Sequence, residues 1–229
     1  MSEISESLSQ PFLWHKIDYP ESDGEPLAET DTHYRQITDL RFSLEQYCTR
    51  KFGQVYVAAN LFLYYVEGDP RKVVASDIFV VLGVSPGDRR IFKLWEEGKG
   101  PDAVFEITSK STRIDDVGNK KGLYEALGVS EYFLFDPLQE YMEPQLRGYR
   151  LEEGLYRPIA EIPLTCKTLG LTLKVDKDNH LRLFEAGSEE PLPTPLEEAE
   201  RAEREAQARL KLEEEVERLK RKLAEVEGR

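Results

Sequence analysis

The strongest constraint on the fold is the short apolar run 103–108, whose sequence is Ala-Val-Phe-Glu-Ile-Thr. Residues of this kind are typical of a strand at the centre of a sheet, where both faces are covered. Glu106 interrupts the run, and a buried carboxylate without a partner costs several kcal/mol or more. The sequence therefore predicts a buried strand and a compensating group beside Glu106.

The rest of the pattern predicts a mixed α/β domain with a central sheet. Apolar residues at steps of three and four predict an amphipathic helix that begins at Asp31 or Thr32 and ends at Gly53. The pattern over residues 111–128 predicts a second helix. β-rich runs predict strands over 54–68, 73–84, 90–98 (as a hairpin strand), 101–109 and 130–137, and hairpins over 148–159 and 169–185.

Composition divides the chain into three parts: an N-terminal arm (1–30), a folded domain (31–195) and a charged helical tail (196–229). The tail has a short heptad seam, which indicates a coiled coil or a homodimer through this helix. The seam spans only about two heptads, so a solvated single helix or a partly disordered tail remains the alternative. Its residues are Leu212, Val216, Leu219, Leu223 and Val226.

The net charge of −13 excludes binding of a polyanion by bulk electrostatics. A nucleic-acid site would need a local basic patch, or carboxylates joined to phosphate by a metal. The two cysteines, Cys48 and Cys166, have no metal-ligand spacing and are expected to be reduced. We expect no signal peptide, no membrane span and a cytoplasmic location.

Two carboxylates interrupt two apolar runs, Asp77 and Glu106. If the two strands are neighbours, these acids can converge, and a divalent metal such as Mg²⁺ is the natural compensation. Asp102 shares a strand face with Glu106, because side chains alternate along a strand.

The predicted helix after Glu106 carries Asp116, Lys120 and Tyr124 at steps of four, so the three line one face. Gly118 and Gly122 are also four apart, which predicts a close approach of this helix to the sheet. Lys120 could then reach the carboxylates and stabilise negative charge on a phosphate. An ordinary buried ion-pair network is the alternative.

Three stretches resemble the Uma-two family of restriction-endonuclease-like proteins: "SDIFVVLGV", "KLWEEGKGPDAVFEITSKSTRIDDVGNKKGLYEALGVSEYFLFDP" and "GYRLEEGLYRPI". The resemblance runs from about Tyr19 to Pro195, and its central motif continues over some thirty-five residues without a gap. It implies the PD-(D/E)XK nuclease fold, a central mixed sheet flanked by helices, with Mg²⁺ or Mn²⁺ as cofactor.

Carried over residue by residue, the resemblance makes Asp77 the first metal-binding acid and Glu106 the second. Thr108 occupies the slot where the superfamily usually has its lysine, and Lys120 matches the family's own lysine on the next helix. Lys110 and Lys121 are weaker substitutes. Among the supporting residues, Asp116 and Tyr124 match the family pattern. Asp102 is a third carboxylate or a strand cap, and His33 with Glu29 is expected to border the site.

We therefore expect a metal-dependent endonuclease that hydrolyses nucleic-acid phosphodiester bonds, with DNA as the favoured substrate. The alternative is a catalytically inactive nuclease-fold protein that serves as a binding or regulatory module and associates through its C-terminal helix. A purely structural coiled-coil protein is disfavoured, because most of the chain is globular.

Overall fold

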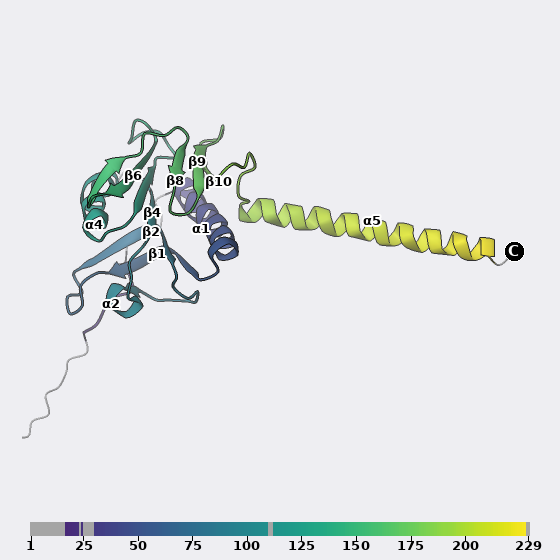
Figure 1. Ribbon diagram of the computed structural model, residues 1–229, viewed down its shortest axis with the longest axis horizontal. Coiled ribbons are helices and arrows are strands. Elements are labelled where there is room, and N and C mark those ends of the chain that lie inside the picture. Colours follow the sequence, from purple (N-terminus) through teal and green to yellow (C-terminus); the bar gives the residue numbers. More distant parts are fainter. Residues whose placement is uncertain (1–16, 23, 25–29, 110–111, 228–229) are drawn as a thin grey trace, which may run out of the picture.

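A seven-stranded mixed sheet forms the centre of the body in the computed structural model, which describes residues 17–22, 24, 30–109 and 112–227 (Figure 1). Its strands, in the spatial order β3-β1-β2-β4-β5-β6-β7, are β1 (Val55–Tyr64), β2 (Val73–Leu82), β3 (Phe92–Lys93), β4 (Ala103–Ile107), β5 (Glu131–Phe135), β6 (Leu146–Glu152) and β7 (Leu155–Pro158). A three-stranded sheet contains β8 (Leu164–Cys166), β9 (Leu171–Val175) and β10 (Leu181–Glu185). The predicted α/β class is confirmed.

The middle of the large sheet brings the two acidic strands side by side. β2 pairs antiparallel with β4, with Ile78 opposite Phe105, and β4 pairs parallel with β5, with Glu106 opposite Leu134. The condition for Asp77 and Glu106 to converge, that their strands are neighbours, is therefore met.

Two separate cores cover the two faces of this sheet. Helix α1 (Asp31–Phe52) and the small sheet pack on one face, which we call the α1 face. Tyr124 of helix α4 (Lys121–Ala126) packs on the other, the α4 face, together with Tyr132 and Tyr156. Covering both faces explains why all five residues of β4 and of β5 are buried.

Helix α1 follows its sequence signals closely. The Thr30 hydroxyl accepts a hydrogen bond from the His33 N–H at the start, and Gly53, with φ 74°, ends the helix. Buried Gln36 accepts a hydrogen bond from Leu181 N–H at 2.7 Å, which joins the helix to the small sheet.

Two local predictions need correction. Residues 90–98 do not form a hairpin strand: Phe92–Lys93 pairs parallel with β1, and Leu94–Glu97 is a short helix, α2. The segment 111–128 is helical, but in three pieces, α3 (Arg113–Asp115), a π-helical turn η1 (Asp116–Lys120) and α4. Such wide turns insert an extra residue and often occur at functional sites.

The prediction that Gly118 and Gly122 let this helix approach the sheet is wrong. Both glycines are exposed, and a Cβ atom built on either would meet nothing within 4 Å. They lie on the solvent side, opposite to Tyr124, because the helix face that meets the sheet is the one carrying the large side chains.

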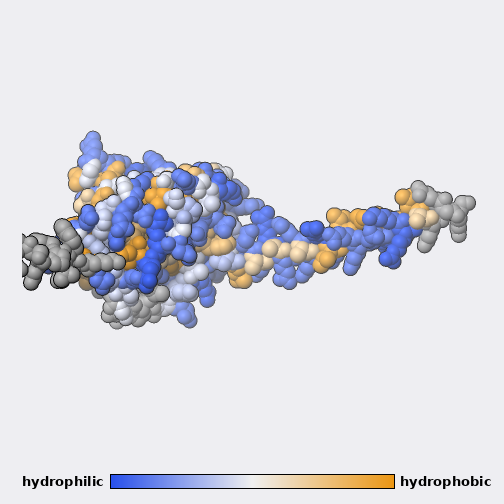
Figure 2. Space-filling model, turned by 90° about the horizontal axis from the view of Figure 1, so that it is seen from below, coloured by the Kyte–Doolittle hydropathy of each residue, from blue (hydrophilic) through white to orange (hydrophobic). Residues whose placement is uncertain are grey.

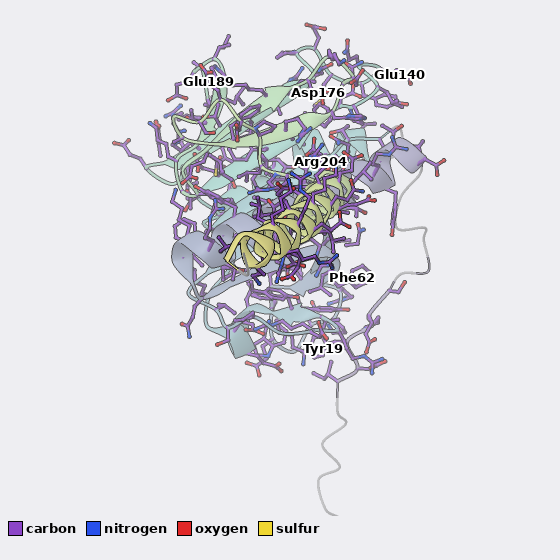
Figure 3. The ribbon with its side chains drawn as sticks, turned by 90° about the vertical axis from the view of Figure 1, so that its right-hand side faces the viewer. Tyr19, Phe62, Glu140, Asp176, Glu189 and Arg204 are labelled. Atoms are coloured by element: carbon purple, nitrogen blue, oxygen red, sulfur yellow. The ribbon has the colours of Figure 1, made fainter. Side chains whose placement is uncertain are left out.

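The C-terminal helix α5 (Pro195–Glu227) extends from the body as a single long rod (Figure 1). Thr194 and Glu197 exchange hydrogen bonds in a capping box at its start, and Arg182 of β10 pairs with Glu197 at 2.7 Å. Figure 3 looks along this helix toward the body, with Arg204 on the rod. Within the described residues, none of the helices is long and apolar enough to cross a membrane.

Candidate active site

Glu106 lies at the centre of a buried polar cluster on the α4 face, and its side chain has no exposed surface. Lys120 Nζ donates to its Oε2 at 3.0 Å, and the Tyr124 hydroxyl donates to its Oε1 at 2.8 Å. The backbone N–H of Asp77 also donates to Oε2, at 3.2 Å. The compensating group that the sequence requires is therefore a set of three donors, one of them charged.

Asp77 and Glu106 lie where strands β2 and β4 stop pairing. The backbone ladder between the strands includes Ile78 with Phe105 and ends there. Beyond this point, side-chain carboxylates replace main-chain carbonyls as the acceptors between the two strands. Asp77 Oδ2 accepts from Ile107 N–H at 2.7 Å, and Asp77 N–H donates to Glu106. The two acids thus occupy a fork between the strands, held by main-chain donors.

Both β1 and β2 change faces at this fork. Residues an even number apart share a face in an undistorted strand. Yet in β2, Val74 packs in the α4-face core and Ile78, four residues on, packs in the α1-face core. In β1, Val57 packs in the α1-face core, and Leu63, six residues on, packs in the α4-face core.

The switch occurs at Asn60, which the register places opposite Asp77 and which has φ 50°, in the left-handed region. Asn tolerates this conformation better than most residues. As a result Ser76 faces Tyr124, with 2.6 Å between the two hydroxyl oxygens, and Asp77 turns toward α1.

Lys120 is shared between two carboxylates. Its Nζ lies 3.0 Å from Glu106 Oε2 and 3.0 Å from Asp116 Oδ1, and its side chain is 11 % exposed. Only the Glu106 contact has hydrogen-bond geometry; the contact with Asp116 is an ion pair, and both Asp116 carboxylate oxygens are buried without a hydrogen-bond partner among the described residues. The Tyr132 hydroxyl donates to the Asp116 carbonyl at 2.9 Å and fixes the π-helical turn over the sheet.

Burial and like charge shape the ionisation of this cluster. Burial raises the pKa of Glu106 well above its usual range; Lys120 lowers it, and Asp77 and Asp116 raise it. Burial also raises the pKa of Asp116, against the effect of Lys120. Burial alone would lower the pKa of Lys120, but Glu106, Asp116 and Asp77 together raise it, so Lys120 is protonated. One lysine faces three carboxylates.

His33 borders the site from α1. Its Nε2 lies 3.4 Å from Asp77 Oδ2, and its side chain is 7 % exposed. Its Nδ1 is buried and has no hydrogen-bond partner among the described residues. The structure therefore places His33 beside the first acid, as the sequence predicts; Glu29 lies outside the described residues.

Three other residues that the sequence analysis discusses make their contacts elsewhere. Asp102 caps the opposite end of β4, where it accepts from Leu82 N–H at 2.7 Å and pairs with Lys99 at 2.8 Å. Thr108 is buried, and its hydroxyl contacts Met142 at 4.0 Å. Lys121 lies 4.3 Å from the centroid of the Tyr149 ring. Lys110 lies outside the described residues.

The donor set at the fork fits a hard cation that keeps most of its own water. Mg²⁺ usually takes one or two protein carboxylates, together with waters and substrate phosphate oxygens. The Asp77 side chain is 16 % exposed, and no described residue donates a hydrogen bond to its Oδ1. Over the described ranges, no three His, Cys, Asp or Glu side chains form a group that could hold a metal. Any cation here would rely on Asp77 and Glu106.

Comparisons with known proteins identify the family of this chain. The family model "Uma2: Putative restriction endonuclease" matches residues 8–172. The chain belongs to this family. A solved structure described as a putative nuclease belonging to DUF820, from Anabaena variabilis ATCC 29413, is 15% identical and covers 62% of this chain and 75% of that chain, with a TM-score of 0.45. The comparison with curated proteins gives no match.

Two residues of this Uma2 site were not predicted from the sequence. Ser76 bonds the Tyr124 hydroxyl, and Asn60 produces the face switch beside Asp77. Ser76 precedes Asp77 directly, so its position was a usable signal. Asn60 sits in a β-rich run that discourages Asn, and that mismatch marks a distortion of the strand.

Proposed function

We propose that this chain is a metal-dependent endonuclease that hydrolyses phosphodiester bonds in DNA. The observation that carries the proposal is the fork itself: two carboxylates from neighbouring strands, with a lysine bonded to one of them. The match to a family described as putative restriction endonucleases supports this reaction class.

Asp77 and Glu106 would hold Mg²⁺ or Mn²⁺, both of which accept oxygen ligands. When bound, such a cation polarises the phosphodiester and promotes ionisation of a water. Glu106 is fully buried and Asp77 is partly exposed, so substrate would approach from the Asp77 side.

Lys120 would stabilise the negative charge that develops on the phosphate. It keeps its charge in the cluster, and its hydrogen bond to Glu106 uses only one of the three N–H donors of the ammonium. A positioned cation in a site with little water acts strongly on developing charge, because the local dielectric is low.

Tyr124 and Ser76 would position Glu106. Tyr124 holds one carboxylate oxygen while Ser76 holds the Tyr124 hydroxyl, and both residues are buried. This pair fixes the Glu106 rotamer and keeps water away from the buried oxygen, as a preorganised site requires.

A paired measurement tests the proposal. Mg²⁺ and Mn²⁺ binding is followed by titration calorimetry, and cleavage of plasmid and single-stranded DNA is assayed on the same samples. The variant is Asp77→Asn, and the control is Asp102→Asn, an acid with a similar backbone-capping role at the other end of β4. We expect loss of binding and cleavage in Asp77→Asn only. Equal behaviour of the two variants would contradict the proposal.

One observation favours a second function, a binding or regulatory module without activity. Both Glu106 oxygens already accept hydrogen bonds from protein donors, as in a structural ion-pair network. In that case the wild-type chain would bind neither Mg²⁺ nor Mn²⁺ and would cleave neither plasmid nor single-stranded DNA. The same calorimetry and cleavage assays therefore distinguish the two functions.

A further inference from the structure

An apolar stripe runs along the exposed half of α5. Leu212, Val216, Leu219 and Leu223 are 65%, 41%, 52% and 56% exposed, and their steps of four, three and four residues place them on one face. Figure 2 shows apolar side chains along the projecting helix, well away from the body. The side chain of Val226, the fifth predicted seam residue, lies outside the described part of the chain.

We propose that this stripe binds the same stripe of a second copy of this chain, with the two helices antiparallel. Val216 lies opposite the Leu219 of the second copy, and Leu212 lies opposite its Leu223. The pairing has two-fold symmetry, so each helix presents the same surface to the other. This interface is independent of the proposed nuclease function.

The charges beside the stripe fit this register. Glu213 and Glu215 precede its centre, and Lys220 and Lys222 follow it. In the antiparallel pair, Glu213 comes next to Lys220 of the second copy and Glu215 next to Lys222. Four attractive pairs form across the dimer. Sliding the helices by one heptad would instead bring Glu215 against Glu215, which is repulsive.

The seam residues nearer the body decide the direction. A parallel pair would also bring Glu215 near Lys220 of the second copy, so these charges alone do not distinguish the antiparallel from the parallel arrangement. However, Glu205 and Arg209 continue the seam positions, and a parallel pair would place Glu205 against Glu205 and Arg209 against Arg209. The antiparallel pair avoids both like-charge contacts, because its register places neither residue opposite its own copy; Arg209, for example, falls opposite position 226.

The geometry separates the two bodies. From Pro195 to the centre of the pair is about 22 residues, or roughly 33 Å of helix, so the two attachment points lie about 66 Å apart. The capping box and the Arg182–Glu197 pair fix the start of each helix to its body. Each body therefore keeps its own site, held at a set distance from the other.

Sedimentation equilibrium of the full chain tests the association. The variant is Leu219→Glu, and the matched control is Leu210→Glu, which changes a leucine that is 61% exposed but lies off the stripe. We expect a dimer whose Kd rises by more than about tenfold in Leu219→Glu and hardly at all in Leu210→Glu. A monomeric wild-type chain, or equal effects of the two changes, would overturn the proposal.

Cysteine cross-linking tests the direction, since the native Cys48 and Cys166 are buried. Chains with Leu212→Cys are mixed with chains carrying Leu223→Cys and are then oxidised. We expect an interchain disulfide in the mixture and none in either variant alone, because like positions are too far apart to bridge. Efficient cross-linking of Leu212→Cys alone would show a parallel pair and contradict the proposal.

Discussion

Glu106 and Glu131 are buried carboxylates on the neighbouring strands β4 and β5, with exposed side-chain fractions of 0% and 1%. Glu131 pairs with Arg150 at 2.9 Å and accepts from the N–H groups of Lys167 and Thr168 at 3.1 and 2.8 Å. Its Oε2 also accepts from the Cys166 thiol at 3.1 Å. Glu131 therefore joins the large sheet to the loop after β8.

Glu106 has a different set of partners. Two of its three donors are side chains of one helical segment, Lys120 and Tyr124, and further carboxylates lie beside it. The fold fixes the position of main-chain N–H donors, whereas a lysine side chain can turn from one acceptor to another. Glu131 therefore has the partners of a structural carboxylate, whereas the partners of Glu106 are consistent with the proposed ligand site.

The largest expected difference concerns activity. Glu106→Gln should reduce kcat/KM for DNA cleavage by about 10³-fold, because a cation and its substrate lose a charged ligand. Glu131→Gln should leave the activity of the folded fraction within about threefold of wild type. Steady-state cleavage, corrected for the folded fraction, measures both. Similar losses in the two variants would remove the functional distinction.

The second difference concerns stability. Glu131→Gln should lower the free energy of unfolding by about 3 kcal/mol, since it leaves Arg150 without its main buried partner. Glu106→Gln should not destabilise the protein, because it removes a charge whose burial and repulsion by Asp77 and Asp116 outweigh its attraction to Lys120. Urea denaturation measures both values. A larger loss for Glu106→Gln would reverse the assignment of the structural carboxylate.

The two adjacent lysines sharpen the comparison further. Lys120→Met should reduce kcat by about 10²-fold, the scale of losing one group that stabilises transition-state charge. Lys121→Met is the control, because Lys121 lies against the Tyr149 ring and not against the carboxylates. Single-turnover cleavage separates the chemical step from binding. Equal rates for the two variants would exclude a role for Lys120 in the reaction.

Stability should also depend on pH through Glu106. Its pKa is raised in the folded protein, so its contribution is present below the ordinary value of 4.5 and is lost as pH rises through the folded pKa. From about pH 4.5 upward, wild type should lose stability relative to Glu106→Gln, by up to about 1.4 kcal/mol per pH unit. Urea denaturation at several pH values measures the difference. A constant difference would contradict the raised pKa.

The smallest expected effect is at Tyr124. Tyr124→Phe removes the O–H that holds Glu106 and should cost about 1 kcal/mol of stability. Tyr156→Phe is the control, since its hydroxyl donates to the Val129 carbonyl in the same core. Both variants should lose similar stability, but only Tyr124→Phe should slow cleavage, by about tenfold. A slower reaction in both would indicate a general effect of core packing.

Much of the fold follows from local signals. The helix predicted over 31–53 is observed at Asp31–Phe52, and the strands around Asp77 and Glu106 are neighbours. Periodicity also placed Lys120 and Tyr124 on the helix face that meets Glu106. The helix and its polar face were predictable because each depends on spacing within one element, which the sequence contains directly. The pairing of β2 with β4 depends instead on the order of strands in the sheet.

Other features depend on residues far apart in the chain. Asp102 is a strand cap because Leu82 and Lys99 lie beside it, and Gly118 faces solvent because larger side chains hold its helix on the sheet. Glu131 gave no signal in the sequence, since its partners arrive from residues 150 and 166–168.

The sequence by itself determined which elements form and which polar residues interrupt them. Only the tertiary structure decided that Glu131 is held by Arg150 and two main-chain donors, and that Glu106 faces a lysine. The physical reason is that desolvation requires every buried charge to find a partner, but it does not specify that partner. The partner depends on strand order and register, which here place Asp77 beside Glu106 at the fork between β2 and β4.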